Sequence, residues 1–139
     1  MRHLAALLAP VAALALPAAA AVAPADRAAI EGVISSQIEA FRRDDAAAAY
    51  GFAAPNIQAL FPTPEIFMRM VRSGYAPVYR PQAVRFAEAV VENGAVVQRV
   101  LLRGPDGRAH LALYTMERQA DGAWKIAAVV LVTLPETGA

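Results

Sequence analysis

Four strand-like segments, separated by glycine-containing turns, constrain the fold of this chain more than any other feature. They span residues 83–91, 95–103, 108–118 and 124–132. The turns between them end in Gly94, Gly107 and Gly122. Asn-Gly and Asp-Gly pairs favour tight hairpins because both residues tolerate positive φ. Long strands that follow one another through such turns predict an antiparallel four-stranded meander.

An amphipathic helix is expected well before these strands. Apolar side chains recur every three or four positions, at Ile30, Val33, Ile34, Ile38 and Phe41. This period places them in one stripe that faces a core. Asp26 is the expected N-cap, because its carboxylate can accept a hydrogen bond from a free backbone N–H of the first turn.

Two more helical segments are expected between this helix and the meander. Asp44 and Asp45 break the first pattern and can cap a short helix through residues 46–52, which Pro55 and Asn56 would end or kink. The sequence Thr63-Pro64-Glu65 combines a cap, a proline at the first helical position and an acid in the first turn, and it predicts a helix that stops at Gly74. Residues 75–81 are expected to form an extended connector.

The first 21 residues have the three-part layout of a secretory signal peptide. Arg2 and His3 form a basic start, residues 4–16 are an apolar run, and small residues with an Ala-x-Ala site follow. We expect cleavage after Ala21, a periplasmic or secreted mature protein, one domain over residues 22–134 and a disordered tail over 135–139. The apolar run is shorter than the ~20 residues that span a bilayer, so no stable membrane anchor is expected.

Composition excludes several classes of site. The chain has no cysteine, so disulfides, thiolate catalysis and zinc–thiolate centres are excluded. Loss of Arg2 with the leader reduces 13 basic side chains to 12, which balance 12 acidic ones, and the mature chain carries no net charge. That balance predicts no nucleic-acid partner. His110 is the only histidine outside the leader, so neither a metal site nor a cofactor is expected.

A family resemblance supports a particular α+β fold. Residues 63–81 (TPEIFMRMVRSGYAPVYRP), 97–102, 107–131 and 30–55 resemble a family known only as domain of unknown function 4864. Helices followed by a curved meander are also the order of the cone-shaped nuclear transport factor 2-like (SnoaL-like) superfamily, which includes steroid isomerases, scytalone dehydratase and polyketide cyclases. The resemblance implies N-terminal helices packed on a curved four-stranded antiparallel meander, and an exported location. It implies no activity.

The cavity of such a cone would lie between the helices and the concave face of the sheet. The polar residues expected to line it or to stand at its mouth are Arg72, Tyr75, Tyr79, Arg80, Gln98 and Tyr114. Those from the 75–81 connector have two interpretations: a rim for an anionic ligand, or a staple that holds the connector on the core. His110 follows a turn and is expected to be exposed, in a surface or structural role. No catalytic residue is assigned, because no known pattern is present.

Three functions remain open at this point. The leading hypothesis is an exported, non-enzymatic binding or accessory module for a small apolar or anionic ligand. The first alternative is an enzyme of the isomerase, dehydratase or cyclase type, with proton transfer by Tyr50, Tyr114, His110 and the Asp44–Asp45 pair. The second alternative is a homodimeric interaction module. It rests on residues 126–132, which are apolar on both faces of a sheet that helices can cover on one side only.

Overall fold

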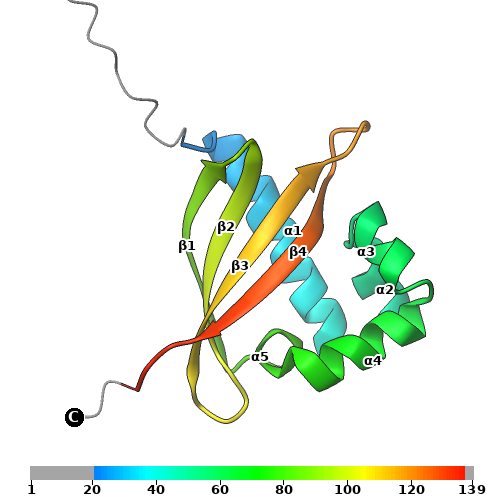
Figure 1. Ribbon diagram of the computed structural model, residues 1–139, viewed down its shortest axis with the longest axis vertical. Helices are drawn as coiled ribbons and strands as arrows, with labels where there is room; N and C mark the ends of the chain where they lie inside the picture. Colours follow the sequence, from blue (N-terminus) through cyan, green and yellow to red (C-terminus); the bar gives the residue numbers. More distant parts are fainter. Residues whose placement is uncertain (1–20, 137–139) are drawn as a thin grey trace, which may run out of the picture.

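The structure, a computed structural model, describes residues 21–136 as helices packed against an antiparallel sheet (Figure 1). The helices are α1 (Pro24–Arg42), α2 (Ala46–Gly51), α3 (Pro55–Leu60), α4 (Pro64–Gly74) and α5 (Ala76–Tyr79). The strands are β1 (Ala83–Glu92), β2 (Ala95–Arg103), β3 (Ala109–Arg118) and β4 (Trp124–Thr133). The α+β class and the four-stranded meander are thereby confirmed. The expected leader, apart from Ala21, and the end of the expected tail lie outside the described residues.

The start of α1 differs from the expectation. The helix begins at Pro24, with Ala23 at the N-cap, and no side chain caps it. Proline suits this position because its fixed φ is helical and its missing N–H would be unpaired there in any case. Asp26 therefore lies inside the first turn, where its carboxylate complements the helix dipole and pairs with Arg118 of β3.

The caps expected for α2 and α4 are confirmed. The Asp45 Oδ1 atom accepts a hydrogen bond from the Ala48 N–H at 3.1 Å. The Thr63 Oγ1 atom accepts one from the Ile66 N–H, also at 3.1 Å. Each bond satisfies a backbone donor that the helix itself leaves unpaired.

Two segments that were expected to be irregular are helical. Pro55 does not merely end α2; it opens α3 from the first helical position. The expected extended connector over residues 75–81 contains α5, a single turn with Pro77 near its start. In both segments the fixed φ of proline favours the start of a helix as readily as its end.

The sheet has the order β1-β2-β3-β4, and each neighbouring pair is antiparallel. The tight hairpin expected at Asn93-Gly94 is confirmed, because both residues have positive φ. The one expected at Asp121-Gly122 is not: only Gly122 has positive φ, and residues 119–123 form a longer loop between β3 and β4. Irregularities interrupt the register between Phe86 and Ala89 in β1 and near Ala127 in β4. Such bulges bend and twist a strand, and so curve the sheet.

One face of the sheet packs on the helices, and α1 runs across it (Figure 1). Inward side chains of β2, β3 and β4 are buried there against the apolar stripe of α1: Val100, Leu102, Ala112, Tyr114, Met116, Ile126, Ile30, Ile34, Ile38 and Phe41. Removal of this apolar surface from water is the main stabilising term of the fold.

The edge of β4 is joined to the segment between α2 and α3. The Ile126 N–H donates to the Phe52 carbonyl at 2.9 Å, and the Ala54 N–H donates to the Ile126 carbonyl at 2.8 Å. The Asn56 side-chain amide donates to the Ala127 carbonyl at 2.9 Å. These bonds hold α3 beside the end strand and leave a space between β4 and the helices further along.

Candidate functional site

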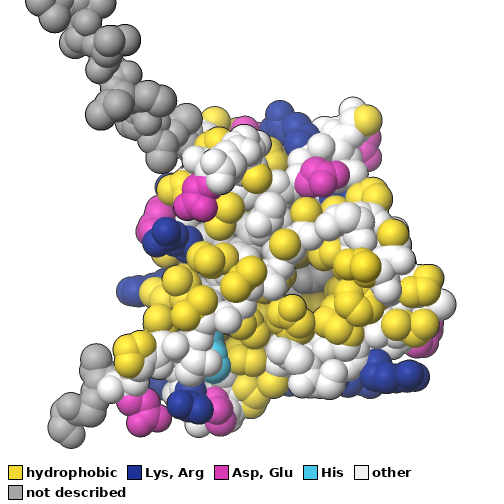
Figure 2. All heavy atoms as spheres, in the orientation of Figure 1, with side chains coloured by type: hydrophobic (Ala, Val, Ile, Leu, Met, Phe, Trp, Pro, Cys, Tyr) yellow, Lys and Arg dark blue, Asp and Glu magenta, His cyan; other side chains and the backbone are white. Residues whose placement is uncertain are grey.

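A cavity of about 340 Å³ lies in that space, between β4 and helices α1, α3, α4 and α5. Figure 2 shows its mouth as a hollow ringed by hydrophobic side chains. Of the fifteen residues that line it, twelve are apolar, and the others are Gln37, Asn56 and Tyr75. None of the fifteen carries a charge at neutral pH, so the cavity favours an uncharged, apolar occupant.

Aromatic contacts give this cavity a defined wall. The ring of Phe67 on α4 lies 6.2 Å from that of Phe41, 6.5 Å from that of Phe61 and 5.5 Å from that of Tyr50. The Tyr50 hydroxyl donates to backbone carbonyls, with the Phe61 oxygen at 2.6 Å. Rings packed in this way have little rotamer freedom, so the wall of the cavity is well defined.

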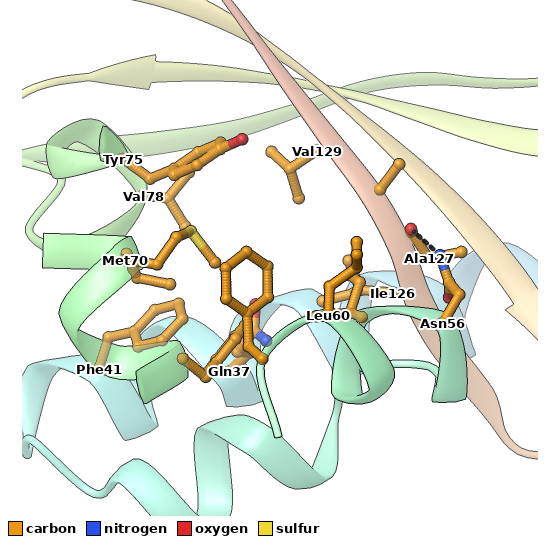
Figure 3. Close-up of a pocket in the computed structure, with 15 residues that line it drawn as sticks. Gln37, Phe41, Asn56, Leu60, Met70, Tyr75, Val78, Ile126, Ala127 and Val129 are labelled. Carbon is orange, nitrogen blue, oxygen red and sulfur yellow. Dashed lines mark hydrogen bonds between the residues drawn. The ribbon is translucent and has the colours of Figure 1, made fainter. Parts of the chain in front are cut away.

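Gln37 is the polar group at the base of the cavity (Figure 3). Its side chain is only 3% exposed. The Nε2 atom donates to the Ala49 carbonyl at 3.1 Å, which fixes the orientation of the amide. Within the described residues the Oε1 atom of Gln37 accepts no hydrogen bond. A nearly buried acceptor is therefore available beside the cavity.

The other two polar residues stand nearer the rim. Figure 3 shows the Tyr75 hydroxyl directed across the cavity toward β4, and the Asn56 amide bonded to Ala127. The Tyr75 hydroxyl has no partner among residues 21–136. Leu60, which is 72% exposed, adds an apolar side chain to the lining.

Of the six residues expected to bind a ligand, the structure places Tyr75 alone in this cavity. Arg72, Tyr79 and Arg80 instead surround Asp44 on the outer surface. Arg72 Nη2 lies 3.1 Å from Asp44 Oδ1, Arg80 Nη2 lies 3.0 Å from Asp44 Oδ2, and the Tyr79 hydroxyl also donates to Asp44. This arrangement follows the staple interpretation, because Arg80, the cation of the connector, already pairs with a carboxylate.

Asp44 differs from its expected role as a helix cap, which only Asp45 performs. Its backbone has a φ of 54°, in the left-handed region that aspartate tolerates better than most residues. The Tyr79 hydroxyl, and then Arg72, hold the pKa of the Asp44 carboxyl below its usual value. Arg72 donates hydrogen bonds to the Tyr79 hydroxyl and to Asp44, and these bonds, in that order of size, raise the pKa of Arg72.

Gln98 and Tyr114 lie in the core, outside the cavity lining, and face each other across β2 and β3. Gln98 Nε2 donates to the Ala87 and Arg99 carbonyls, each at 2.9 Å. The Tyr114 hydroxyl is fully buried and has no partner among the described residues. Burial raises the pKa of Tyr114, so this phenol stays neutral.

The groups of the enzyme hypothesis are not brought together. The cavity lining includes none of Tyr50, Tyr114, His110 and the Asp44–Asp45 pair. His110 was expected to be exposed, but it is 8% exposed, because its ring faces inward and its Nδ1 atom lies 3.2 Å from Thr133 Oγ1 on β4. Within residues 21–136 no three His, Cys, Asp or Glu side chains gather in a way that could hold a metal ion.

The sequence interpretation missed Gln37. Its signal was a single glutamine in the apolar stripe of α1, between Ile34 and Phe41 in the helical period. Such a residue is either paired inside the core or turned toward a space. In this structure its nitrogen is paired with the Ala49 carbonyl, and its side chain forms part of the cavity lining.

The fold and the cavity define a small α+β protein in which helices cover one face of an antiparallel meander. Residues 23–139 match the model of the family described as Domain of unknown function (DUF4864), and the chain belongs to that family. No curated protein and no solved structure matches the chain. Among the described helices, none is both long and apolar enough to cross a membrane.

Proposed function

We propose that this protein is an exported, non-enzymatic module that binds a small, uncharged, apolar molecule in the cavity beside β4. The observation that carries the proposal is the lining itself: twelve apolar side chains, three neutral polar ones and no charge. The volume of about 340 Å³ lies at the lower end of the ~300–1,000 Å³ typical of ligand pockets. This lining contains none of the residues considered for proton transfer in the enzyme hypothesis, and this favours binding over catalysis.

We assign the fold, within the same proposal, to the nuclear transport factor 2-like cone. Three features support the assignment: helices precede a four-stranded meander, bulges interrupt β1 and β4, and the cavity lies between the helices and the sheet. An experimental structure whose sheet proved flat, with no space between β4 and α4, would contradict both the cone and the binding site.

The proposed export has one supporting contact in the structure. Val22 is 9% exposed and belongs to the core cluster. Cleavage after Ala21 would keep this buried side chain, whereas cleavage after Ala23 would remove it. The site preferred from the Ala-x-Ala pattern is therefore also the one that preserves the core.

A cavity-filling variant tests the binding function. Val129 of β4 points into the cavity (Figure 3), and Val129→Phe should occupy part of its volume. Val130→Phe is the matched control, because the adjacent side chain lies on the opposite face of the strand and is 54% exposed. Thermal shift would be measured with benzene, naphthalene and their neutral derivatives. A ligand at 100 times its Kd stabilises a protein by about 2.7 kcal/mol.

The proposal predicts that such ligands raise the Tm of the wild-type protein and of Val130→Phe, but not that of Val129→Phe. If none of these compounds shifts the wild-type Tm, or if all three proteins respond equally, the cavity is not a binding site for apolar molecules.

A second proposed function is homodimerisation through the face of the sheet that the helices leave uncovered. Figure 2 shows this face, where hydrophobic side chains gather over β3 and β4. Val130 and Val132 are 54% and 44% exposed, and they pair across the strands with the half-buried Leu113 and Leu111. A contiguous apolar surface of this kind is typical of an interface, and an identical copy would present the same surface to it.

Light scattering at micromolar concentration tests this second proposal. The wild-type protein should have twice the mass of the monomer, and Val130→Glu with Val132→Glu should reduce it to the monomer. Ala123→Glu, in the exposed turn before β4, is the control and should stay dimeric. A monomeric wild-type protein would refute the interface.

A further inference from the structure

We infer that the ligand of the cavity carries a hydroxyl or N–H group that donates a hydrogen bond to the Oε1 atom of Gln37. The inference rests on the proposed binding function and adds the chemical class of the ligand: a neutral molecule of one or two rings with a single donor at its inner end.

The geometry of Gln37 supplies the first step. Its Nε2 atom is committed to the Ala49 carbonyl at 3.1 Å, so the opposite side of the amide presents the oxygen. That oxygen has no partner within the described residues, although the side chain is 97% buried. Gln37 Oε1 is not among the fully buried side-chain atoms that lack a partner, so water in the cavity can reach it. A ligand that displaces this water leaves the acceptor unpaired unless the ligand brings a donor of its own.

The surroundings of Gln37 supply the second step. The aromatic wall around Phe67 and the apolar side chains of β4 leave this amide as the polar group at the base of the cavity. An apolar ligand that reaches the base must therefore either satisfy the Oε1 atom or exclude water from it. Only a donor at the inner end of the ligand satisfies it, since an ether or carbonyl oxygen would place two acceptors together.

Charge and volume narrow the class further. No ionised side chain lines the cavity, so a carboxylate or ammonium group would lose its hydration without a partner. An apolar protein cavity of ~150 Å³ holds one benzene ring. A cavity of about 340 Å³ therefore suits one ring with substituents or two fused rings. Phenols, naphthols and cyclic alcohols have these properties, whereas long acyl chains exceed the volume.

Binding of three matched compounds tests the inference: 2-naphthol, 2-methylnaphthalene and 2-methoxynaphthalene. They share a ring system and differ in whether they donate a hydrogen bond. Calorimetric titration of the full mature chain should give a Kd for 2-naphthol roughly tenfold lower than for either of the others, which corresponds to one neutral hydrogen bond. The wild-type ranking shows whether the cavity selects a donor, and Tyr75→Phe tests the rim hydroxyl, even if a variant of Gln37 fails to fold.

Variants of Gln37 and Tyr75 then show which side chain accepts the hydrogen bond from the ligand. Gln37→Leu removes the acceptor and should bring the three affinities to within about twofold of one another. Tyr75→Phe removes the competing hydroxyl at the rim. A preference for 2-naphthol that disappears in Tyr75→Phe and persists in Gln37→Leu would overturn the assignment to Gln37.

The outcomes also separate this inference from the proposed function. If all three compounds bind with equal affinity, the cavity binds apolar molecules but does not select those that donate a hydrogen bond. The inference about Gln37 is then wrong, and the proposed binding function stands. If none binds, the proposed function fails with it.

Discussion

The buried hydroxyl of Tyr114 gives the sharpest test of the energetics of this fold. The side chain is fully buried, and its oxygen has no hydrogen-bond partner among the described residues. A buried polar group without a partner costs roughly 1–3 kcal/mol relative to one that is satisfied. Tyr114→Phe removes this cost and leaves only the small void of one oxygen atom, which lowers the gain. We expect a net stabilisation of about 1 kcal/mol.

Tyr50→Phe is the matched control, because it makes the same chemical change at a hydroxyl that is bonded. The Tyr50 hydroxyl donates to the Phe61 carbonyl at 2.6 Å. Loss of this bond should lower the free energy of unfolding by about 1 kcal/mol. The free energy of unfolding should therefore be higher than that of the wild-type protein for Tyr114→Phe and lower for Tyr50→Phe. The two variants should differ from each other by about 2 kcal/mol.

Urea unfolding followed by circular dichroism measures both effects. The midpoint should rise for Tyr114→Phe and fall for Tyr50→Phe at an unchanged m-value, since neither variant alters the surface exposed on unfolding. Each kcal/mol corresponds to a Tm shift of about 3–6 °C in a domain of this size. A Tyr114→Phe variant that is destabilised as much as Tyr50→Phe would refute the reasoning, and would show that the Tyr114 hydroxyl is paired, for instance with a buried water.

Three further predictions follow from the local structure. Thr63→Ala should lower the free energy of unfolding by about 1 kcal/mol in the same urea assay, because the N-cap bond to Ile66 is lost. The pKa of Asp44 is lowered in the folded state, so its contribution to stability is fully present above the ordinary carboxyl pKa of ~3.9 and is lost as the pH falls through the folded value. Asp44→Asn should therefore lower the urea midpoint at pH 7 and flatten its decline below pH 4; an unchanged acid profile would contradict this linkage. Mass spectrometry of protein recovered from the periplasm or medium should find Val22 at the N-terminus, and a chain that retains residues 1–21 would exclude cleavage.

The elements that could be predicted from the sequence are those governed by local chemistry. The turns at Gly94, Gly107 and Gly122 require positive φ, which few other residues adopt, so their positions were unambiguous. The caps at Asp45 and Thr63 likewise depend on residues within one helical turn. The strand bounds followed from the turns and differ by one residue at most from the structure.

The misassigned elements depend on context beyond a few residues. A proline is compatible both with the end of one helix and with the first turn of another. Pro55 and Pro77 both lie in the first turn of a helix. Asp44 could not be recognised as the centre of an ionic cluster, because its partners lie 28 to 36 positions further along the chain.

The candidate site was the least predictable part, for a geometric reason. Gln98 and Tyr114 were expected to line the cavity, and they do face the core, since both are fully buried. Alternation in a strand can show which side chains face inward. It does not show where along that face the helices stand off from the sheet. The space opens beside β4, whereas these two residues lie on the central strands β2 and β3, so Gln37, Asn56 and Tyr75 are the polar residues of the cavity.

The bonds between the α2–α3 segment and β4 have a consequence for the order of folding. They join Phe52, Ala54 and Asn56 to Ile126 and Ala127, residues separated by about 70 positions. A chain that emerges from its N-terminus therefore makes its helices long before the strand that anchors α3 exists. Contacts of such high sequence separation are formed late, because a long loop must close first. The cavity, one wall of which is β4, is thus expected to be among the last parts of the molecule to be completed, and a chain that stops before residue 126 would lack that wall.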